Sequence, residues 1–132
     1  MSQENVDLLR AWIEAFNRRD RDALARLNHP HIEWTTSAED PDAATHQGHE
    51  AVQRYIDGYV DAFPDLHIEA TECFPVGSDR VFTTNRFSGH SASGVPMEWL
   101  LRTVTTYEGG RVARVAEYFD RAEALEAAGL SE

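Results

Sequence analysis

Apolar residues recur at helical spacing in two stretches of the chain. Over residues 5–18 they follow three- and four-residue steps, which is one face of an amphipathic helix. Residues 50–63 repeat this spacing with an almost unbroken apolar and aromatic stripe, which Pro64 ends. Between them, Asp20 is placed to cap a further short helix. The pattern predicts that helices dominate the first half of the chain.

Elsewhere the apolar positions alternate with a period of two. His29-Pro30 ends the second helix, and a first strand is expected directly after it, over residues 31–36. Turn residues separate the remaining strands, which are expected over residues 67–76, 80–88, 97–107 and 111–119.

Two other segments complete the expected order of elements. Residues 37–48 are rich in Asp, Ala and Thr, and we expect a long loop there, a lid or a rim. Asp120 begins a capping box that opens a last short helix, and Gly129 closes that helix. Helices first and strands afterwards favour an α+β fold, with helices packed on one face of a curved, mostly antiparallel sheet. No repeat or shift in composition marks a second domain, so residues 1–132 are expected to form a single domain.

Composition and charge narrow the class of protein. The chain has 23 acidic and 12 basic residues, a formal charge of −11, with 42% apolar residues. This excess of acid disfavours nucleic acid and anionic membranes as partners, because phosphates are repelled. No apolar run approaches the roughly twenty residues that span a bilayer. A polar amino terminus and the single Cys73 favour a reducing, cytoplasmic location.

One carboxyl group falls among apolar positions. On the last expected strand Glu117 shares a face with Ala113, Val115 and Phe119, opposite Val112. A carboxyl in apolar surroundings is costly to ionise, so its pKa should rise toward neutrality, as suits a general acid or base. The alternative is a structural role, in which Glu117 faces solvent or pairs with Arg102 or Arg86 on a neighbouring strand.

Other reactive residues give weaker signals. The histidine pairs His29/His31 and His46/His49 have no acidic or thiol partner at a ligand spacing, so no metal site and no cofactor are predicted. Cys73 fits a strand residue better than a nucleophile.

Aromatic residues crowd the inward faces of the expected elements. They fit either a plain core or an apolar pocket, since buried Tyr and Trp need partners for their polar groups, and we favour a pocket. The inward aromatic set is Trp12, Phe16, Trp34, Tyr55, Tyr59, Phe63, Trp99 and Phe119, and Leu101 and Thr103 share the face of Trp99.

These motifs together resemble the NTF2-like superfamily, and within it the SnoaL-like proteins related to polyketide cyclases and ketosteroid isomerases. The likeness covers about residues 5–130. It rests on Ala15-Phe16-Asn17-Arg18-Arg19-Asp20, His29-Pro30, Ile32-Glu33-Trp34, Gly48-His49-Glu50-Ala51-Val52, Gly109-Gly110-Arg111-Val112, Glu117-Tyr118-Phe119-Asp120 and the segment from Ala124 to Leu130. The resemblance implies a cone formed by a bent sheet over helices, an apolar pocket at its open end, and a homodimer through the outer face of the sheet.

The resemblance also allows the active positions to be compared. The isomerases' Tyr, base and second Asp fall at Trp12, Trp34 and Thr103, so isomerisation by that machinery is disfavoured. The cyclases' acidic group corresponds to Glu117, while their His falls at Thr103. The Arg of the related epoxide hydrolases is not matched, because Arg102 has the opposite strand parity to Thr103.

The sequence thus leaves two functions open. The first is a pocket for a small apolar or carbonyl-bearing molecule, polycyclic ones included, with Glu117 as general acid or base and with Trp12, Trp34 and Thr103 shaping the pocket and donating hydrogen bonds to a substrate oxygen. The second is a non-catalytic ligand-binding or dimerising module.

Overall fold

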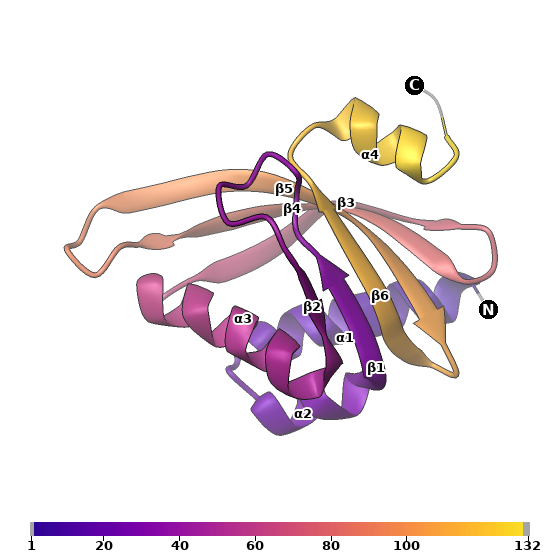
Figure 1. The fold of residues 1–132 in the computed structure, drawn as a ribbon, viewed down its shortest axis with the longest axis horizontal. Coiled ribbons are helices and arrows are strands. Elements are labelled where there is room, and N and C mark those ends of the chain that lie inside the picture. Colours follow the sequence, from indigo (N-terminus) through magenta and orange to yellow (C-terminus); the bar gives the residue numbers. More distant parts are fainter. Residues whose placement is uncertain (1, 131–132) are drawn as a thin grey trace.

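A strongly bent sheet with helices on both of its faces forms the protein in the computed structural model, which describes residues 2–130 (Figure 1). The domain predicted over residues 1–132 therefore includes three residues, 1, 131 and 132, that lie outside the described part. The elements follow the order α1 (Ser2–Asn17), α2 (Arg21–Leu27), β1 (Asn28–Thr35), β2 (Thr45–Gln47), α3 (Gly48–Ala62), β3 (His67–Val76), β4 (Arg80–His90), β5 (Pro96–Glu108), β6 (Arg111–Tyr118) and α4 (Arg121–Ala127).

The strands lie in the order β2-β1-β6-β5-β4-β3, and neighbours are antiparallel except β1 and β6, which are parallel. The helices α1, α2 and α3 lie on the concave side of the sheet, and α4 lies on the convex side (Figure 1). The predicted α+β class, with a curved and mostly antiparallel sheet over the first helices, is confirmed.

Capping residues and turn glycines begin or end several elements where the sequence predicted. Asp20 caps α2 by accepting a hydrogen bond from the Ala23 N–H at 3.1 Å, and Asp120 caps α4 by accepting one from the Ala122 N–H at 2.9 Å. Both glycines of the turn between β5 and β6, Gly109 and Gly110, have positive φ, at 58° and 76°. A two-residue hairpin turn of this kind requires that backbone conformation, which glycine adopts at little cost.

Two boundary predictions and one face assignment are wrong. The first strand begins at Asn28 rather than after His29-Pro30, because Asn28 already pairs with Val112 of β6. The loop expected over residues 37–48 contains β2, an edge strand too short to show a period of its own. The face assigned to Val112 is also wrong, because a register shift after Thr106 turns this side chain to the concave side.

Two hydrophobic clusters stabilise the sheet from its two sides. The larger cluster lies between the concave face and α1, α2 and α3. The smaller one lies under α4 on the convex face, and consists of Val76, Phe82, Val104, Ala124, Leu125 and Ala128. The convex cluster is separate from the concave side, where the candidate site lies.

Candidate functional site

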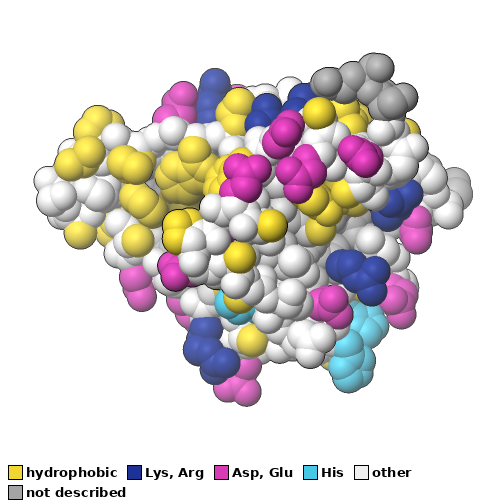
Figure 2. Space-filling model, turned by 45° about the horizontal axis from the view of Figure 1, so that its top comes forward, with side chains coloured by type: hydrophobic (Ala, Val, Ile, Leu, Met, Phe, Trp, Pro, Cys, Tyr) yellow, Lys and Arg dark blue, Asp and Glu magenta, His cyan; other side chains and the backbone are white. Residues whose placement is uncertain are grey.

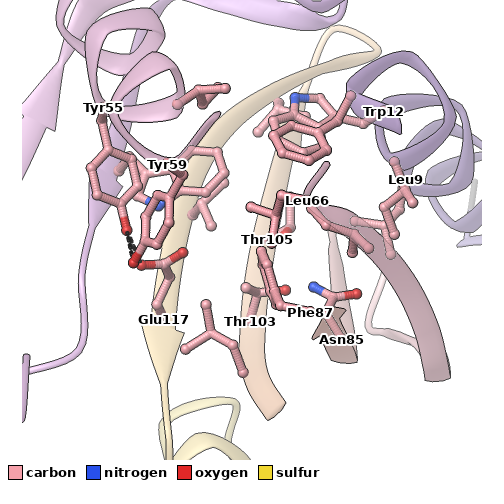
Figure 3. Close-up of a pocket in the computed structure, with 18 residues that line it drawn as sticks. Leu9, Trp12, Tyr55, Tyr59, Leu66, Asn85, Phe87, Thr103, Thr105 and Glu117 are labelled. Carbon is pink, nitrogen blue, oxygen red and sulfur yellow. Dashed lines mark hydrogen bonds between the residues drawn. The ribbon is translucent and has the colours of Figure 1, made fainter. Parts of the chain in front are cut away.

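A narrow cavity of about 60 Å³ lies on the concave side of the sheet, between α1, α3 and the inner faces of the strands (Figure 3). Most of its lining is apolar or aromatic. The lining residues are Leu9, Trp12, Ile13, Phe16, Trp34, Tyr55, Ile56, Tyr59, Leu66, Ile68, Asn85, Phe87, Leu101, Thr103, Thr105, Val112, Val115 and Glu117. An apolar cavity with a few convergent polar groups is the usual form of a small-molecule site.

Glu117 lies on the concave face of β6 with only 6% of its surface exposed. Its register partner on β5 is Thr103, so the two side chains stand next to each other on this face. Burial raises the pKa of the Glu117 carboxyl from its ordinary 4.5 to about 7, and the charge of Asp40 adds a smaller rise in the same direction. Near neutral pH this carboxyl is therefore present in both protonation states.

No cation neutralises Glu117 within residues 2–130. Arg102 lies on the convex face and donates a hydrogen bond to the Phe119 carbonyl oxygen at 2.7 Å, and Arg86 pairs with Glu69. Neither of the two structural explanations considered for Glu117, exposure to solvent or an ion pair with one of these arginines, applies.

Tyr55 is the direct hydrogen-bond partner of Glu117. It comes from α3, 62 residues away in sequence, and its hydroxyl donates to Oε1 of Glu117 at 2.8 Å (Figure 3). The Tyr59 hydroxyl lies 3.4 Å from that of Tyr55. A tyrosine has one hydroxyl proton, and that of Tyr55 is directed to Glu117, so Tyr59 can donate its proton either to the Tyr55 oxygen or to an acceptor in the cavity. Burial raises the pKa of both tyrosines, which keeps them protonated as donors.

The Trp34 indole adds a further donor at this end of the cavity. Its Nε1–H is close enough to Glu117 to lower the pKa of the carboxyl, but it makes no hydrogen bond of normal geometry with any described residue. Trp34 is 8% exposed and packs against the Trp12 and Tyr55 rings. A buried N–H without a partner costs free energy. An acceptor atom bound in the cavity would remove this cost by accepting a hydrogen bond from Trp34.

The structure brings most of the sequence-predicted site residues together. Those that line the cavity are Trp12, Phe16, Trp34, Tyr55, Tyr59, Leu101, Thr103 and Glu117. Trp12, however, donates its Nε1–H to Oδ1 of Asn28 at 3.0 Å, so the expectation that it donates to a substrate oxygen is not met in this conformation.

Three predicted residues lie outside the lining. The Phe63 ring packs against Trp99 in a tilted arrangement at 5.4 Å, and Trp99 stacks on Phe87 at 5.2 Å, so Phe63 and Trp99 form an aromatic layer behind the cavity wall. Phe119 is 37% exposed, because β6 ends at Tyr118 and the chain turns away toward α4. The prediction that Phe119 shares the cavity face of Glu117 is wrong.

Sequence reasoning missed Asn85 and Phe87, which β4 contributes to the cavity. The strand was expected, but its faces were not assigned. The period-two rule applied to Val81, Thr83, Asn85 and Phe87 places all four on one face, and this signal was present in the sequence.

The histidines are dispersed rather than gathered at one centre. His46 stacks on the Tyr55 ring at 4.6 Å, and His49 Nε2 lies 2.8 Å from the Asn28 carbonyl oxygen. Within the described range no group of three or more His, Cys, Asp or Glu side chains is placed to hold a metal ion.

The segment between β1 and β2 lies near the polar end of the cavity. Its neck is closed by the Thr36 N–H, which donates to the Ala44 carbonyl oxygen at 3.0 Å, and by the Ala44 N–H, which donates to Oγ1 of Thr36 at 2.9 Å. Asp40 in this segment raises the pKa of both Glu117 and Tyr59. Of the lid and the rim considered for this segment, the arrangement favours a rim: the segment lies beside the cavity, and its own hydrogen bonds hold it in an ordered turn.

Comparison with known families gives one decisive match. The family model for SnoaL-like domains matches residues 9–115 of the chain. The protein belongs to the SnoaL-like domain family. The match includes the second half of α1, all of α3 and most of the sheet, hence nearly all of the cavity, and it ends just before Glu117.

Solved structures share the fold of this SnoaL-like protein. Bal32a, from a soil-derived mobile gene cassette, has a TM-score of 0.82 and 22% identity, over 93% of this chain and 94% of its own. A putative SnoaL-like polyketide cyclase from Jannaschia sp. has a TM-score of 0.78 and 18% identity, over 91% and 88%. TerC, co-crystallised with polyporic acid, has a TM-score of 0.77 and 19% identity, over 96% and 98%. At these identities the likeness establishes the NTF2-like fold alone.

A search of curated protein sequences found no match. Among the helices of residues 2–130, none is both long enough and apolar enough to cross a bilayer.

Proposed function

We propose that this SnoaL-like protein binds a small, largely apolar molecule with an oxygen function in the cavity, and that Glu117 exchanges a proton with it. The single observation that carries the proposal is Glu117 itself: a buried carboxyl without a cationic partner, opening onto an apolar cavity, with a pKa of about 7. Such a group donates and accepts protons readily near neutral pH, as isomerase- and cyclase-type acid–base chemistry requires.

The surrounding donors define how a ligand oxygen would be held. Because Oε1 of Glu117 accepts from Tyr55, the acidic proton of the neutral carboxyl resides on Oε2. The N–H of Trp34 and the hydroxyl of Tyr59 supply hydrogen bonds for an oxygen that gains negative charge during proton transfer. The chemistry needs no metal or redox group, since a proton is the only species that moves.

The size of the cavity restricts the ligand. An engineered apolar cavity of about 150 Å³ binds benzene. The cavity here, at about 60 Å³, is smaller, so side chains at its mouth must move to admit even a single ring. We therefore favour a compact ligand over the polycyclic one considered from the sequence. TerC, which has the same fold, was co-crystallised with polyporic acid.

The titration of Glu117 tests this proposal directly. We expect its side-chain carboxyl, followed by carbon-detected NMR, to titrate with a midpoint of about 7. The Glu117→Gln variant, which lacks this carboxyl, assigns its signal, and the value of a free glutamate, about 4.3, is the reference. A midpoint for Glu117 at the reference value contradicts acid–base function and favours the second candidate, a non-catalytic binding module.

We also propose that the single domain works as a homodimer. Exposed apolar side chains support it: Val95, Met97 and Leu100 lie 41–52% exposed at the β4–β5 end, where Figure 2 shows hydrophobic side chains gathered on the left. Light scattering after size exclusion is expected to give twice the 14.9 kDa of the chain, and Leu100→Lys should lower that mass. A wild-type mass of one chain at high concentration rules the dimer out.

A further inference from the structure

Asn85 is a buried polar residue that the mechanism above does not use. It lies on the concave face of β4, lines the cavity, and has only 6% of its surface exposed (Figure 3). Its Oδ1 is buried without a hydrogen-bond partner in the described chain. Most buried polar side-chain atoms in proteins do have such a partner, because an unpaired one costs free energy.

The other buried asparagines of the protein are each paired. Asn5 donates to the Ser78 carbonyl oxygen at 3.0 Å, and Asn28 accepts from the Trp12 indole at 3.0 Å. The half-buried Asn17, beside β3, also donates to and accepts from the Ile68 backbone at 2.9 Å. These contacts hold helices, strands and turns together. Asn85 makes no such contact, so the fold gives no reason for an amide at this position.

The site of Asn85 is well separated from Glu117. Across the sheet Glu117 pairs with Thr103, Thr103 pairs with Thr83, and Asn85 lies two residues further along β4 than Thr83. The strand spacing and rise place the two backbones about 12 Å apart along the sheet, with the side chains closer across the concave face. Apolar residues such as Leu101 and Val115 line the space around them. The cavity therefore has polar groups at two places with apolar surface between them.

We propose that Asn85 is a specificity-determining residue that binds a second polar group of the ligand. The cavity is then built for a compact apolar molecule with two oxygen functions, one at Glu117 and Trp34 and the other at Asn85. This inference rests on the proposed function only in that the cavity binds a ligand, and it adds the chemical class of that ligand. The unpaired Oδ1 of Asn85 is an acceptor, so a hydroxyl group of the ligand, which donates, satisfies it.

Discrimination follows from the cost of leaving Asn85 unpaired. A ligand that fills the cavity but has no polar group at this place buries the amide against apolar atoms. Sites built to hydrogen-bond a ligand group strongly reject analogues that lack it, for this reason. We expect the preference for the second oxygen to be about tenfold or more in affinity.

The experiment uses two ligand pairs that differ by one hydroxyl: phenol with hydroquinone, and hexanol with hexanediol. The affinity of each compound for the wild type and for Asn85→Val is measured by NMR titration. The ratio of the two affinities within a pair is compared between the wild type and the variant, because the difference in hydration between the two compounds is the same for both proteins and cancels. Asn85→Ala repeats the measurement with a smaller side chain, in case valine disturbs the packing of β4.

Asn28→Val is the matched control for stability, because Asn28 is also a buried strand asparagine but is paired with Trp12. Its Tm should fall by several degrees. The Tm of Asn85→Val should stay unchanged or rise, because removing an unpaired buried amide removes a cost rather than a contact.

The expected result is a drop of about tenfold or more in the preference for the doubly oxygenated compound of at least one pair, with Tm maintained. A change below about threefold in both pairs overturns the inference, and so does a wild type that discriminates within neither pair. A loss of Tm in Asn85→Val as large as that in Asn28→Val also overturns it, since Asn85 would then be structural. The titration of Glu117 is independent of all these readouts, so failure here is distinguishable from failure of the proposed function.

Discussion

Replacement of Glu117 by glutamine is expected to stabilise the protein by about 3 kcal/mol at about pH 8 and by less than about 1 kcal/mol at about pH 5. Glutamine has the shape of the protonated carboxyl, and its amide oxygen can still accept the hydrogen bond from Tyr55. Urea unfolding of the wild type and the variant at the two pH values measures the difference.

The sign follows from proton binding in the two states. The unfolded chain releases the proton of Glu117 near its ordinary pKa of 4.5, whereas the folded protein retains it up to about 7. Between these values the folded state holds more protons than the unfolded state, so stability falls as pH rises through this window and levels off above it. Above the window the folded wild type contains a buried carboxylate with no cationic partner, and the glutamine variant does not.

Glu108→Gln is the matched control, because Glu108 is an exposed carboxyl on β5. It should change stability by less than about 0.5 kcal/mol at either pH. If Glu117→Gln is less stable than the wild type by the same amount at both pH values, the pKa of Glu117 is not raised and its charge is a structural requirement.

The same variant is also expected to lose about 10²–10⁴-fold in turnover on a substrate found by screening compact oxygenated compounds. This is the usual contribution of a general acid or base.

Phe82→Ala is expected to lower the free energy of unfolding by about 3–5 kcal/mol without changing the pKa of Glu117. Phe82 is fully buried under α4 on the convex face, where it stacks on Phe74 at 4.9 Å. Its removal leaves a void in a cluster that does not line the cavity. Chemical denaturation gives the stability, and the NMR titration of Glu117 checks that the site is intact.

Phe119→Ala provides the comparison for Phe82→Ala, because Phe119 has the same side chain but is exposed. Its effect should stay below about 1 kcal/mol. If Phe82→Ala instead moves the titration of Glu117 toward its ordinary value, then the convex cluster supports the site, and the separation of the two clusters is only apparent.

Local sequence patterns were sufficient for much of the fold. The apolar spacing over residues 50–63 predicted α3 with its inward tyrosines, and strand alternation placed Glu117 beside Val115 on a buried face. These features depend on the period of a helix or strand, which adjacent residues set. The same alternation failed at Val112 and Phe119, because a register shift and the end of β6 interrupt it.

The partners of the site residues could not be read from such patterns. Tyr55 reaches Glu117 across 62 residues, and Asn85 is distinguished from Asn28 only by having no partner. Contacts of this kind depend on how α3 is packed against the sheet and on which strands are neighbours, and no local period contains that information.

The sequence by itself determined that this is an α+β chain with one carboxyl, Glu117, on an apolar strand face. The tertiary structure decided what that carboxyl is. It buried Glu117 away from every arginine, which raises its pKa to about 7, and it placed Tyr55, Trp34 and the unpaired Asn85 around one cavity. The physical reason is that hydrophobic periodicity acts within one element, whereas desolvation and hydrogen-bond pairing depend on every element that packs against it.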